Sequence, residues 1–298
     1  MEKISDIKTL TEEELKNWLK EVGEKPFRAD QIRNRLFCGQ VKSFNEMETI
    51  PAALREKLSA NFRITSLEEA KRLISVDGTV KWLYQTHDGH HIETVLIPTN
   101  DRFSVCVSTQ IGCAQNCAFC RTAKMGFIRN LEAGEILEEI IRVNWYLEET
   151  GTKHSDGSLA KVTNIIFMGM GEPLNNLEQV HRVCCTLHHQ KLFNLGRKRM
   201  TISTSGVVPK IKELVDRNTP CCLAVSLNST NDERRSAVMP VNKVWNIAKL
   251  LEATDEYTKR TGNYVTFEFV LMKGITCSEE AARELIRICA PRRCKVNA

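Results

Sequence analysis

The sequence predicts an α/β fold, in which a helical N-terminal segment and a β-hairpin precede a parallel sheet with helices outside it. Three observations predict this fold. Helical periodicity dominates the N-terminal segment, and a His-Asp-Gly-His turn separates two runs rich in β-branched and aromatic residues. From Ser104 onward, short apolar strands alternate with helical segments. Repeated βα units of this kind build a parallel sheet because their crossovers are right-handed.

The N-terminal segment, residues 1–78, is predicted to form a small helical domain. Thr11 and Glu14 have the spacing of a capping box, and Gly23 ends the apolar periodicity that follows them. A second periodic segment comes next, and a third begins at Pro51, a favourable first-turn residue. The arginines of these helices suit phosphate contacts and solvated helix faces equally.

The rest of the chain divides into a connecting β-hairpin, residues 79–98, and a βα core, residues 99–298. Strand counting predicts five strands from Ser104 onward and a sixth that is cut short near the end of the sequence. The predicted strands are 79–86, 91–97, 104–109, 162–168, 200–204, 223–227, 265–272 and the sixth from 295; the predicted helices are 131–149, 177–187, 209–215, 247–257 and 278–289.

The composition excludes several classes of protein. The 298 residues carry 42 Lys plus Arg against 37 Asp plus Glu, a net charge of +5. This mildly positive charge is compatible with a nucleic-acid partner but does not by itself indicate one. The first twenty residues lack the apolar region of a signal peptide, and no apolar run is long enough to span a membrane. We therefore expect a cytoplasmic protein without a membrane partner. In that compartment, the 12 cysteines indicate metal or redox chemistry rather than structural disulfides.

Three cysteines on one short loop are the clearest chemical signal. Cys113, Cys117 and Cys120 have C-x3-C-x2-C spacing directly after a predicted strand. Three thiolates can hold three corners of an iron–sulfur cluster and leave the fourth iron open to a small molecule. The alternative is a zinc knot with Cys106 as the fourth ligand. Phe119, before the last cysteine, suits core packing or a platform for an adenine ring.

These residues and several further motifs resemble one family. The cysteine loop is similar to that of the radical S-adenosylmethionine (SAM) superfamily. Within it, the chain resembles the RlmN family, the dual-specificity adenine C2-methyltransferases of ribosomal and transfer RNA, through the segments GEKPFRADQI, CVSTQIGCAQNCAFC, GFIRNL, FMGMGEPLNN, TISTSGVVPKI, RSAVMPVNK and CKVN. The resemblance implies a partial (β/α)6 radical SAM barrel. It also implies a 4Fe-4S cluster and SAM as cofactors, ribosomal RNA and tRNA as partners, and an electron donor such as flavodoxin or ferredoxin.

The resemblance assigns SAM contacts to residues at strand ends. Taken alone, Gly171 would indicate a tight βα turn, and a serine at a strand end is more often a helix cap. The chain departs from the family at Asn228, where the family usually has His; Asn still donates and accepts hydrogen bonds but does not become protonated near neutral pH. The implied SAM contacts are Gly171, Glu172, Ser203, Ser226, Leu227 and Asn228.

Two further residues match the family's catalytic positions. Cys106 resembles the cysteine that releases the product through a transient disulfide, and Glu93 resembles the proton acceptor. Without the resemblance, Cys106 would be a buried strand cysteine and Glu93 a solvent-facing side chain. In the implied reaction, cleavage of SAM yields a radical, and a second, distal cysteine carries the methyl carbon to adenine C2.

That distal cysteine follows CKVN in the family and has no counterpart before Ala298. We therefore expect the 298-residue chain to bind a cluster and cleave SAM without completing methyl transfer. Two alternatives stay open. One is a cluster-free, truncated RNA-binding remnant with a zinc site, and the other is a radical SAM enzyme that acts on another substrate.

Overall fold

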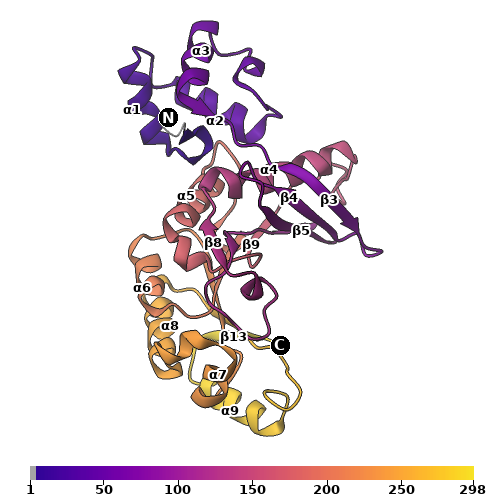
Figure 1. The fold of residues 1–298 in the computed structure, drawn as a ribbon, viewed down its shortest axis with the longest axis vertical. Coiled ribbons are helices and arrows are strands. Elements are labelled where there is room, and N and C mark those ends of the chain that lie inside the picture. Colours follow the sequence, from indigo (N-terminus) through magenta and orange to yellow (C-terminus); the bar gives the residue numbers. More distant parts are fainter. Residues whose placement is uncertain (1–4) are drawn as a thin grey trace. The chain divides into compact units, whose positions relative to one another are not determined.

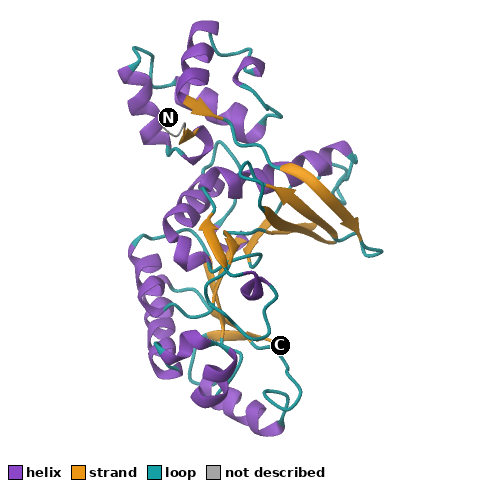
Figure 2. Cartoon of the chain, viewed as in Figure 1, coloured by secondary structure: helices purple, strands orange, loops and turns teal. Residues whose placement is uncertain are grey.

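The computed structural model describes residues 5–298 and divides into two compact units, which are described separately. Figure 1 labels their elements, and Figure 2 distinguishes helices from strands. The mixed α/β fold predicted from the sequence is confirmed. The first unit consists of Met1–Val107, Leu131–Ile165 and Arg182–Gly196, and the second consists of Ser108–Asn130, Ile166–His181 and Arg197–Ala298.

Three helices begin the first unit, as their periodicity predicts. The predicted capping box is present: the Glu14 N–H donates to Thr11 Oγ1 at 3.2 Å, and the Thr11 N–H donates to the Glu14 carboxylate at 2.7 Å. Gly23 follows the first helix with a φ of 79°, which suits glycine. The elements are β1 (Ser5–Asp6), η1 (Ile7–Thr9), α1 (Glu12–Glu21), α2 (Arg28–Cys38), η2 (Phe44–Glu46), α3 (Ala52–Asn61) and β2 (Phe62–Arg63), which pairs with β1.

An antiparallel sheet follows in the same unit. Its strands are neighbours in the order β3 (Glu68–Ile74), β4 (Val80–Gln85), β5 (His91–Thr99) and β6 (Arg102–Cys106). Alternate residues of β4 are buried, so one face of this strand belongs to the core. The sequence does not predict β3, because all seven of its residues are exposed and no apolar face marks it. Its charged side chains are typical of an edge strand.

Helix α4 (Ala133–Glu149) matches the helix predicted for this region. It contacts both the N-terminal segment and the antiparallel sheet of the first unit. Glu138 forms an ion pair with Lys8, and both side chains are only 2% exposed. Thr94 of β5 donates a hydrogen bond to Glu139 at 2.5 Å. Breaking a buried ion pair by removing one partner typically costs about 3–5 kcal/mol, because the other charge is left buried and unpaired. These contacts therefore fix α4 against the N-terminal segment and the sheet.

The second unit contains parallel strands with helices between them. The strands are neighbours in the order β10 (Met200–Thr204), β11 (Cys222–Ser226), β12 (Val265–Glu268) and β13 (Cys294–Asn297). The central residues of β11 are fully buried, as expected for a parallel strand covered on both faces. The predicted sixth strand is present as β13, parallel to β12. The helices between the strands are α6 (Val208–Asp216), α8 (Ile247–Thr261) and α9 (Glu279–Cys289).

Shorter elements complete the second unit, and most of them are close in sequence to the cysteine loop or to the predicted SAM contacts. Strand β9 (Asn164–Phe167) and helix α5 (Leu177–His188) match predicted elements, and each crosses from one unit to the other along the chain. A helix both long and apolar enough to cross a membrane is absent from residues 5–298. The shorter elements are β7 (Gln110–Gly112), η3 (Thr122–Met125), β8 (Phe127–Asn130), η4 (Pro173–Asn176), η5 (Arg197–Arg199), α7 (Asp232–Val238) and η6 (Pro240–Lys243).

Candidate active site

The cysteine loop of the second unit is closed at its base by a small hairpin. Strand β7 pairs with β8 on the other side of the loop, and the Cys113 N–H donates to the Gly126 carbonyl at 2.9 Å. Gly112 has a φ of 75°, and a Cβ atom there would lie 1.7 Å from the Gly126 oxygen, so only glycine fits. Inside the loop, the Cys120 N–H donates to the Cys117 carbonyl at 3.1 Å. The three predicted ligands are thus held on one tightly closed segment.

The environment of these thiols favours a bound cation. Burial raises the pKa of Cys113, and it raises the pKa of Cys117 to about 12. The charges of Glu172 and Cys120 raise the pKa of Cys113 further, and those of Cys113 and Cys120 raise the pKa of Cys117, so these sulfur atoms lie within electrostatic reach of one another. Thiolates that oppose one another are stabilised when a positive centre binds them all. Phe119 is 43% exposed and does not belong to the core.

This donor set fits a 4Fe-4S cluster held by three cysteines. All three are free thiols, and Cys117 and Cys120 are partly accessible. Among residues 5–298, no group of three or more His, Cys, Asp or Glu side chains is gathered tightly enough to hold a single metal ion. A zinc knot brings four ligands to within about 2.0–2.3 Å of one ion. The arrangement therefore gives no support to the zinc alternative.

The turn after β9 is clamped against β7, beside the cysteine loop. The Thr109 and Gln110 N–H groups donate to the Met170 carbonyl at 2.8 and 3.2 Å. The Glu172 N–H donates to Gln110 Oε1 at 2.8 Å. Gly171 has a φ of 106°, and a Cβ atom there would lie 2.6 Å from Gln110 Cβ. The tight turn that glycine indicated is therefore present, and it serves to place Glu172.

Glu172 is a buried carboxylate held by neutral donors. The side chain of this residue, which is 3% exposed, accepts hydrogen bonds from the Ser205 N–H and hydroxyl, both at 2.7 Å, and from the Leu174 N–H at 3.1 Å. Burial raises the pKa of Glu172, and these hydrogen bonds oppose that rise. A buried anion without a cationic partner gains most from an ammonium group. Glu172 therefore fits the predicted contact to the SAM amine.

The other predicted SAM contacts lie at the carboxyl ends of two adjacent parallel strands. Ser203 lies on β10 opposite Ala224 of β11, and Ser226 is the last residue of β11. Ligands of α/β sheets bind at this edge of the strands. The sequence did not predict Ser205, the residue that joins β10 to Glu172, because a serine after a strand gives the same signal as a helix cap.

Asn228 uses both sides of its amide within the protein. Its backbone φ is 53°, a conformation that Asn tolerates better than most residues. Its Oδ1 accepts from the Val270 N–H at 3.0 Å, and its Nδ2 lies 3.4 Å from Met239 Sδ. Leu227, beside it, is fully buried. Where the family usually has His, this chain therefore has a residue that fixes the loop after β11.

The two predicted catalytic residues belong to the first unit. Cys106 ends β6 and lies opposite Val95 of β5. Because side chains alternate along a strand, Glu93 and Val95 share one face, so Glu93 and Cys106 are diagonal neighbours on the half-exposed face of the sheet. Glu93 forms an ion pair with Lys81 at 2.6 Å, with both side chains more than 40% exposed (44% for Lys81 and 42% for Glu93). The structure therefore brings these two residues together.

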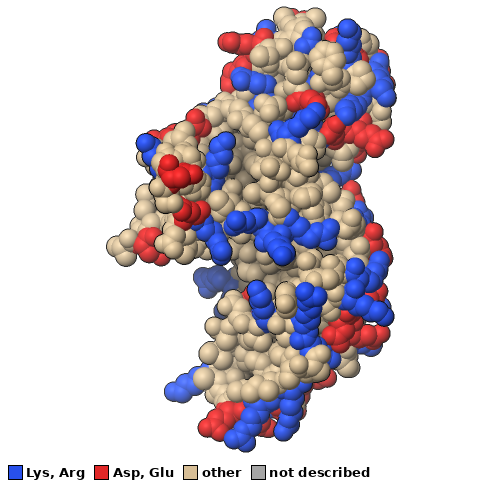
Figure 3. All heavy atoms as spheres, turned by 180° about the vertical axis from the view of Figure 1, so that it is seen from behind, with Lys and Arg blue, Asp and Glu red and all other residues tan. Residues whose placement is uncertain are grey.

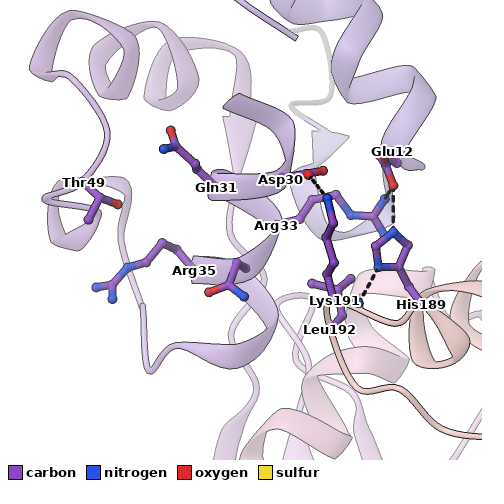
Figure 4. Close-up of a pocket in the computed structure, with 10 residues that line it drawn as sticks. Glu12, Asp30, Gln31, Arg33, Arg35, Thr49, His189, Lys191 and Leu192 are labelled. Atoms are coloured by element: carbon purple, nitrogen blue, oxygen red, sulfur yellow. Dashed lines mark hydrogen bonds and ion pairs between the residues drawn. The ribbon is translucent and has the colours of Figure 1, made fainter. Parts of the chain in front are cut away.

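The first unit also contains an open pocket of about 480 Å³ beside α2 (Figure 4). Arg33 is buried, and its Nη1 lies 3.7 Å from Glu12 Oε2. Lys191 reaches across to Asp30 at 2.6 Å. The pocket contains none of the site residues predicted from the sequence. Its lining residues are Glu12, Asp30, Gln31, Arg33, Asn34, Arg35, Thr49, His189, Lys191 and Leu192.

Comparison with known proteins assigns the family. Residues 5–64 match the ribosomal RNA large subunit methyltransferase N-terminal domain, and residues 107–286 match the radical SAM superfamily. A probable dual-specificity RNA methyltransferase RlmN from Bacillus licheniformis is 42% identical over 285 residues, 96% of this chain and 77% of that protein. The dual-specificity RNA methyltransferase RlmN from Anaeromyxobacter dehalogenans is 41% identical over 292 residues, covering 98% of this chain and 77% of that protein.

A solved structure agrees with the sequence relatives. The crystal structure of a radical SAM methyltransferase from Sphaerobacter thermophilus superposes with a TM-score of 0.90 at 38% identity, covering 98% of this chain and 84% of that one. The family match, the clamped cysteine loop and the buried carboxylate beside it agree with one another. The chain therefore belongs to the RlmN family of radical SAM RNA methyltransferases.

Proposed function

We propose that this protein acts in the methylation of C2 of adenine in ribosomal RNA and tRNA, with a 4Fe-4S cluster and SAM as cofactors. Methyl transfer requires in addition the distal cysteine that the resemblance implies, so the expectation that residues 1–298 cleave SAM without completing the transfer stays a prediction. The observation that carries the proposal is the junction of two features in the second unit. The loop with Cys113, Cys117 and Cys120 is clamped through β7 to the turn that places the buried Glu172. Relatives at 41–42% identity are named dual-specificity RNA methyltransferases, which supports RNA as the substrate.

The residues of the second unit divide the work of binding. The loop thiols hold the cluster, and Glu172 binds the methionyl ammonium of SAM. Ser203, Ser226, Leu227 and Asn228 line the same strand ends. When bound, the cluster and SAM supply the electron and the 5′-deoxyadenosyl radical that this reaction needs, while the protein orients the reactants and excludes water. An electron donor such as flavodoxin or ferredoxin and a cytoplasmic location complete the proposal.

The catalytic roles in the first unit are also proposals. Cys106 forms a transient disulfide with the distal cysteine that carries the methyl carbon in the implied reaction; this breaks the bond between that cysteine's sulfur and the carbon and releases the product. Glu93 acts as the proton acceptor. Their place on one face of the antiparallel sheet supports a shared task. Lys81, paired with Glu93 at 2.6 Å, orients the carboxylate until substrate arrives.

The helical segment, as part of a domain spanning residues 1–78, is proposed to contact RNA. Its pocket offers guanidinium donors that no protein group uses: among the described residues, the Nε atoms of Arg33 and Arg35 are buried without a hydrogen-bond partner. Guanidinium groups suit phosphate because they donate in a planar fork. Figure 3 shows Lys and Arg at several places on the visible face, with acidic side chains among them, so RNA contacts need not lie on a single basic stripe. The predicted ranges 79–98 and 99–298 stay a prediction for the hairpin and the radical SAM core.

Anaerobic reconstitution tests the proposed function. We expect about four irons per chain and formation of 5′-deoxyadenosine from SAM after reduction. In a form of the protein that includes the distal cysteine, we also expect 2-methyladenosine in RNA, detected by mass spectrometry. Glu93→Gln and Cys106→Ala should keep deoxyadenosine formation and lose the methylated nucleoside. Retained RNA methylation in both variants would exclude these roles, and a chain that methylates no RNA in any form would contradict the function itself.

A further inference from the structure

Arg235 on α7 is a fully buried cation outside the roles assigned so far. Its side chain is 0% exposed. It donates to Leu227 O at 2.8 Å, Asn242 Oδ1 at 2.9 Å, Ser205 O at 2.7 Å and Ser226 O at 3.0 Å. All four acceptors are neutral oxygens, and burial lowers the pKa of Arg235 to about 10. A buried charge lowers the stability of the fold unless it is paired or hydrogen-bonded. Here the four hydrogen bonds of Arg235 offset that cost, and they hold its partners in position.

The partners of Arg235 are the backbone groups that end the SAM-binding strands. Ser226 ends β11 and Leu227 directly follows it, and Ser205 directly follows β10. The N–H and hydroxyl of Ser205 are also the donors that hold the Glu172 carboxylate, at 2.7 Å each. One guanidinium group thus spans two strand ends and acts, through Ser205, on the carboxylate proposed to bind the SAM amine.

The surrounding residues leave room for this side chain and fix its direction. Gly206 has a φ of 110°, and a Cβ atom there would lie 3.3 Å from Arg235 Nη2 and 3.1 Å from a Leu250 methyl group. Asn242 presents its oxygen to Arg235 because its amide nitrogen donates to the carbonyl and the carboxylate of Asp232, both at 3.0 Å. This geometry explains why the motif RSAVMPVNK begins with an arginine and contains an asparagine.

The same segment supports the cysteine loop. The Ala118 N–H donates to the Val238 carbonyl at the end of α7, at 2.9 Å. Cys117 packs against the apolar cluster that contains Val238. Helix α7 therefore contacts both halves of the site.

We propose that Arg235 is a positioning residue that holds the cysteine loop and the SAM-binding strand ends in one arrangement and places a positive charge beside the cluster. The proposal rests on the proposed function to the extent that the loop holds a cluster. A nearby positive charge raises the reduction potential, because reduction adds negative charge to the cluster. A lysine would keep the charge but lack the planar fork that reaches several carbonyls.

Two variants and a matched control separate charge from geometry. Arg235→Gln removes both, Arg235→Lys keeps the charge, and Arg234→Gln changes the neighbouring, partly exposed arginine, whose nearest carboxylates are 3.9–4.0 Å away. We expect Arg235→Gln to weaken SAM binding at least tenfold and to shift the cluster potential to a more negative value. Arg235→Lys should weaken SAM binding with a potential close to that of the wild type. Arg234→Gln should match the wild type in both measurements.

Hydrogen exchange of the cluster-free protein gives a readout that needs neither cofactor. Residues 113–121 should exchange faster in Arg235→Gln than in Arg234→Gln, because the support of the loop through α7 is loosened. Equal exchange, or SAM affinity and potential equal to those of the control, would overturn the proposal. If Arg235→Gln does not fold, wild-type SAM affinity in Arg235→Lys overturns it as well. A wild-type chain that binds both cofactors but methylates no RNA contradicts the proposed function and leaves these tests of Arg235 intact.

Discussion

The residues that we assign to function are held in opposite ways in the two units. In the second unit, Glu172 and Arg235 are buried, and each makes several hydrogen bonds to backbone groups at strand ends. In the first unit, Glu93 is half-exposed and paired with one lysine, and Arg35 keeps a donor without a partner among the described residues. Buried networks of satisfied groups are rigid, whereas exposed pairs rearrange at little cost.

This difference teaches which ligand each unit suits. A cluster and SAM have fixed shapes and need groups that are already in place before they bind. An RNA loop must be unstacked and adjusted before a base can react. Exposed side chains with loosely held partners can exchange those partners for phosphate or base atoms. The comparison therefore supports the proposal that the second unit binds the cofactors and that the first contacts RNA.

The largest expected effect comes from the cysteine loop. Cys117→Ala removes one of three ligands, and we expect the reconstituted chain to lose nearly all cluster iron, because two thiolates from the loop cannot hold a cubane. Iron analysis and the visible absorption of the cluster measure this. Cys277→Ala, which changes an exposed cysteine outside the loop, is the matched control and should retain its iron. A Cys117→Ala chain with full iron would break the assignment of this unit to the cofactors.

The next effect concerns the buried carboxylate. Glu172→Ala should keep the cluster and weaken SAM binding by about 10- to 150-fold, the value of one charge-assisted hydrogen bond of about 1.5–3 kcal/mol. Titration calorimetry on reconstituted protein measures the affinity. Glu178→Ala, in which a surface glutamate that pairs with Arg217 at 2.6 Å is removed, serves as the control. Equal affinities in the two variants would remove Glu172 from the SAM site.

The sequence predicted the elements that have one dominant apolar pattern. The helix capped by Thr11 and the buried strand β11 follow from periodicity alone, because each buries a regular set of apolar side chains. Strand β3 escaped prediction because its residues are exposed on both faces and its place is fixed by pairing with β4. The loop that joins β3 to β4 contains Asp77 and Gly78, and this turn is the one local signal that could have indicated the hairpin.

Site residues could be predicted from the sequence where their type and spacing are characteristic of a particular chemistry. Three cysteines on a loop and a glutamate after two glycines signal their tasks through their type and spacing. Arg235 gave no such signal, because it lies in the charged run Asp-Glu-Arg-Arg, which is typical of a solvated helix end. Its burial results from the way α7 packs on strand ends from distant parts of the chain. Only the folded structure shows that this charge is internal.

The pH dependence of stability sharpens the comparison. Burial raises the pKa of Glu172 above its ordinary value, so the native protein binds more protons than the unfolded chain between these two values. The free energy of unfolding of the cofactor-free protein should therefore fall as pH rises from about 4.3 through the raised pKa. Urea denaturation of the wild type and of Glu172→Gln, which cannot titrate, isolates this slope as their difference. A difference that stays constant with pH would show that Glu172 is not held in an unfavourable charged state.

The smallest effect is expected at the pocket of the first unit. Arg35→Ala removes a guanidinium whose Nε has no partner among residues 5–298, so the cofactor sites and the fold should be little changed. If Arg35 contacts one RNA phosphate, RNA affinity should fall, and the slope of its logarithm against the logarithm of salt concentration should decrease in magnitude by about 0.7–0.9. Fluorescence anisotropy with a tRNA fragment at several salt concentrations measures both. Arg72→Ala, on β3 and outside the pocket, removes an arginine that pairs with Glu69 at 2.6 Å and should keep the wild-type slope. Identical slopes in the two variants would exclude Arg35 as a phosphate contact. The pocket would then no longer support the proposal that the first unit contacts RNA.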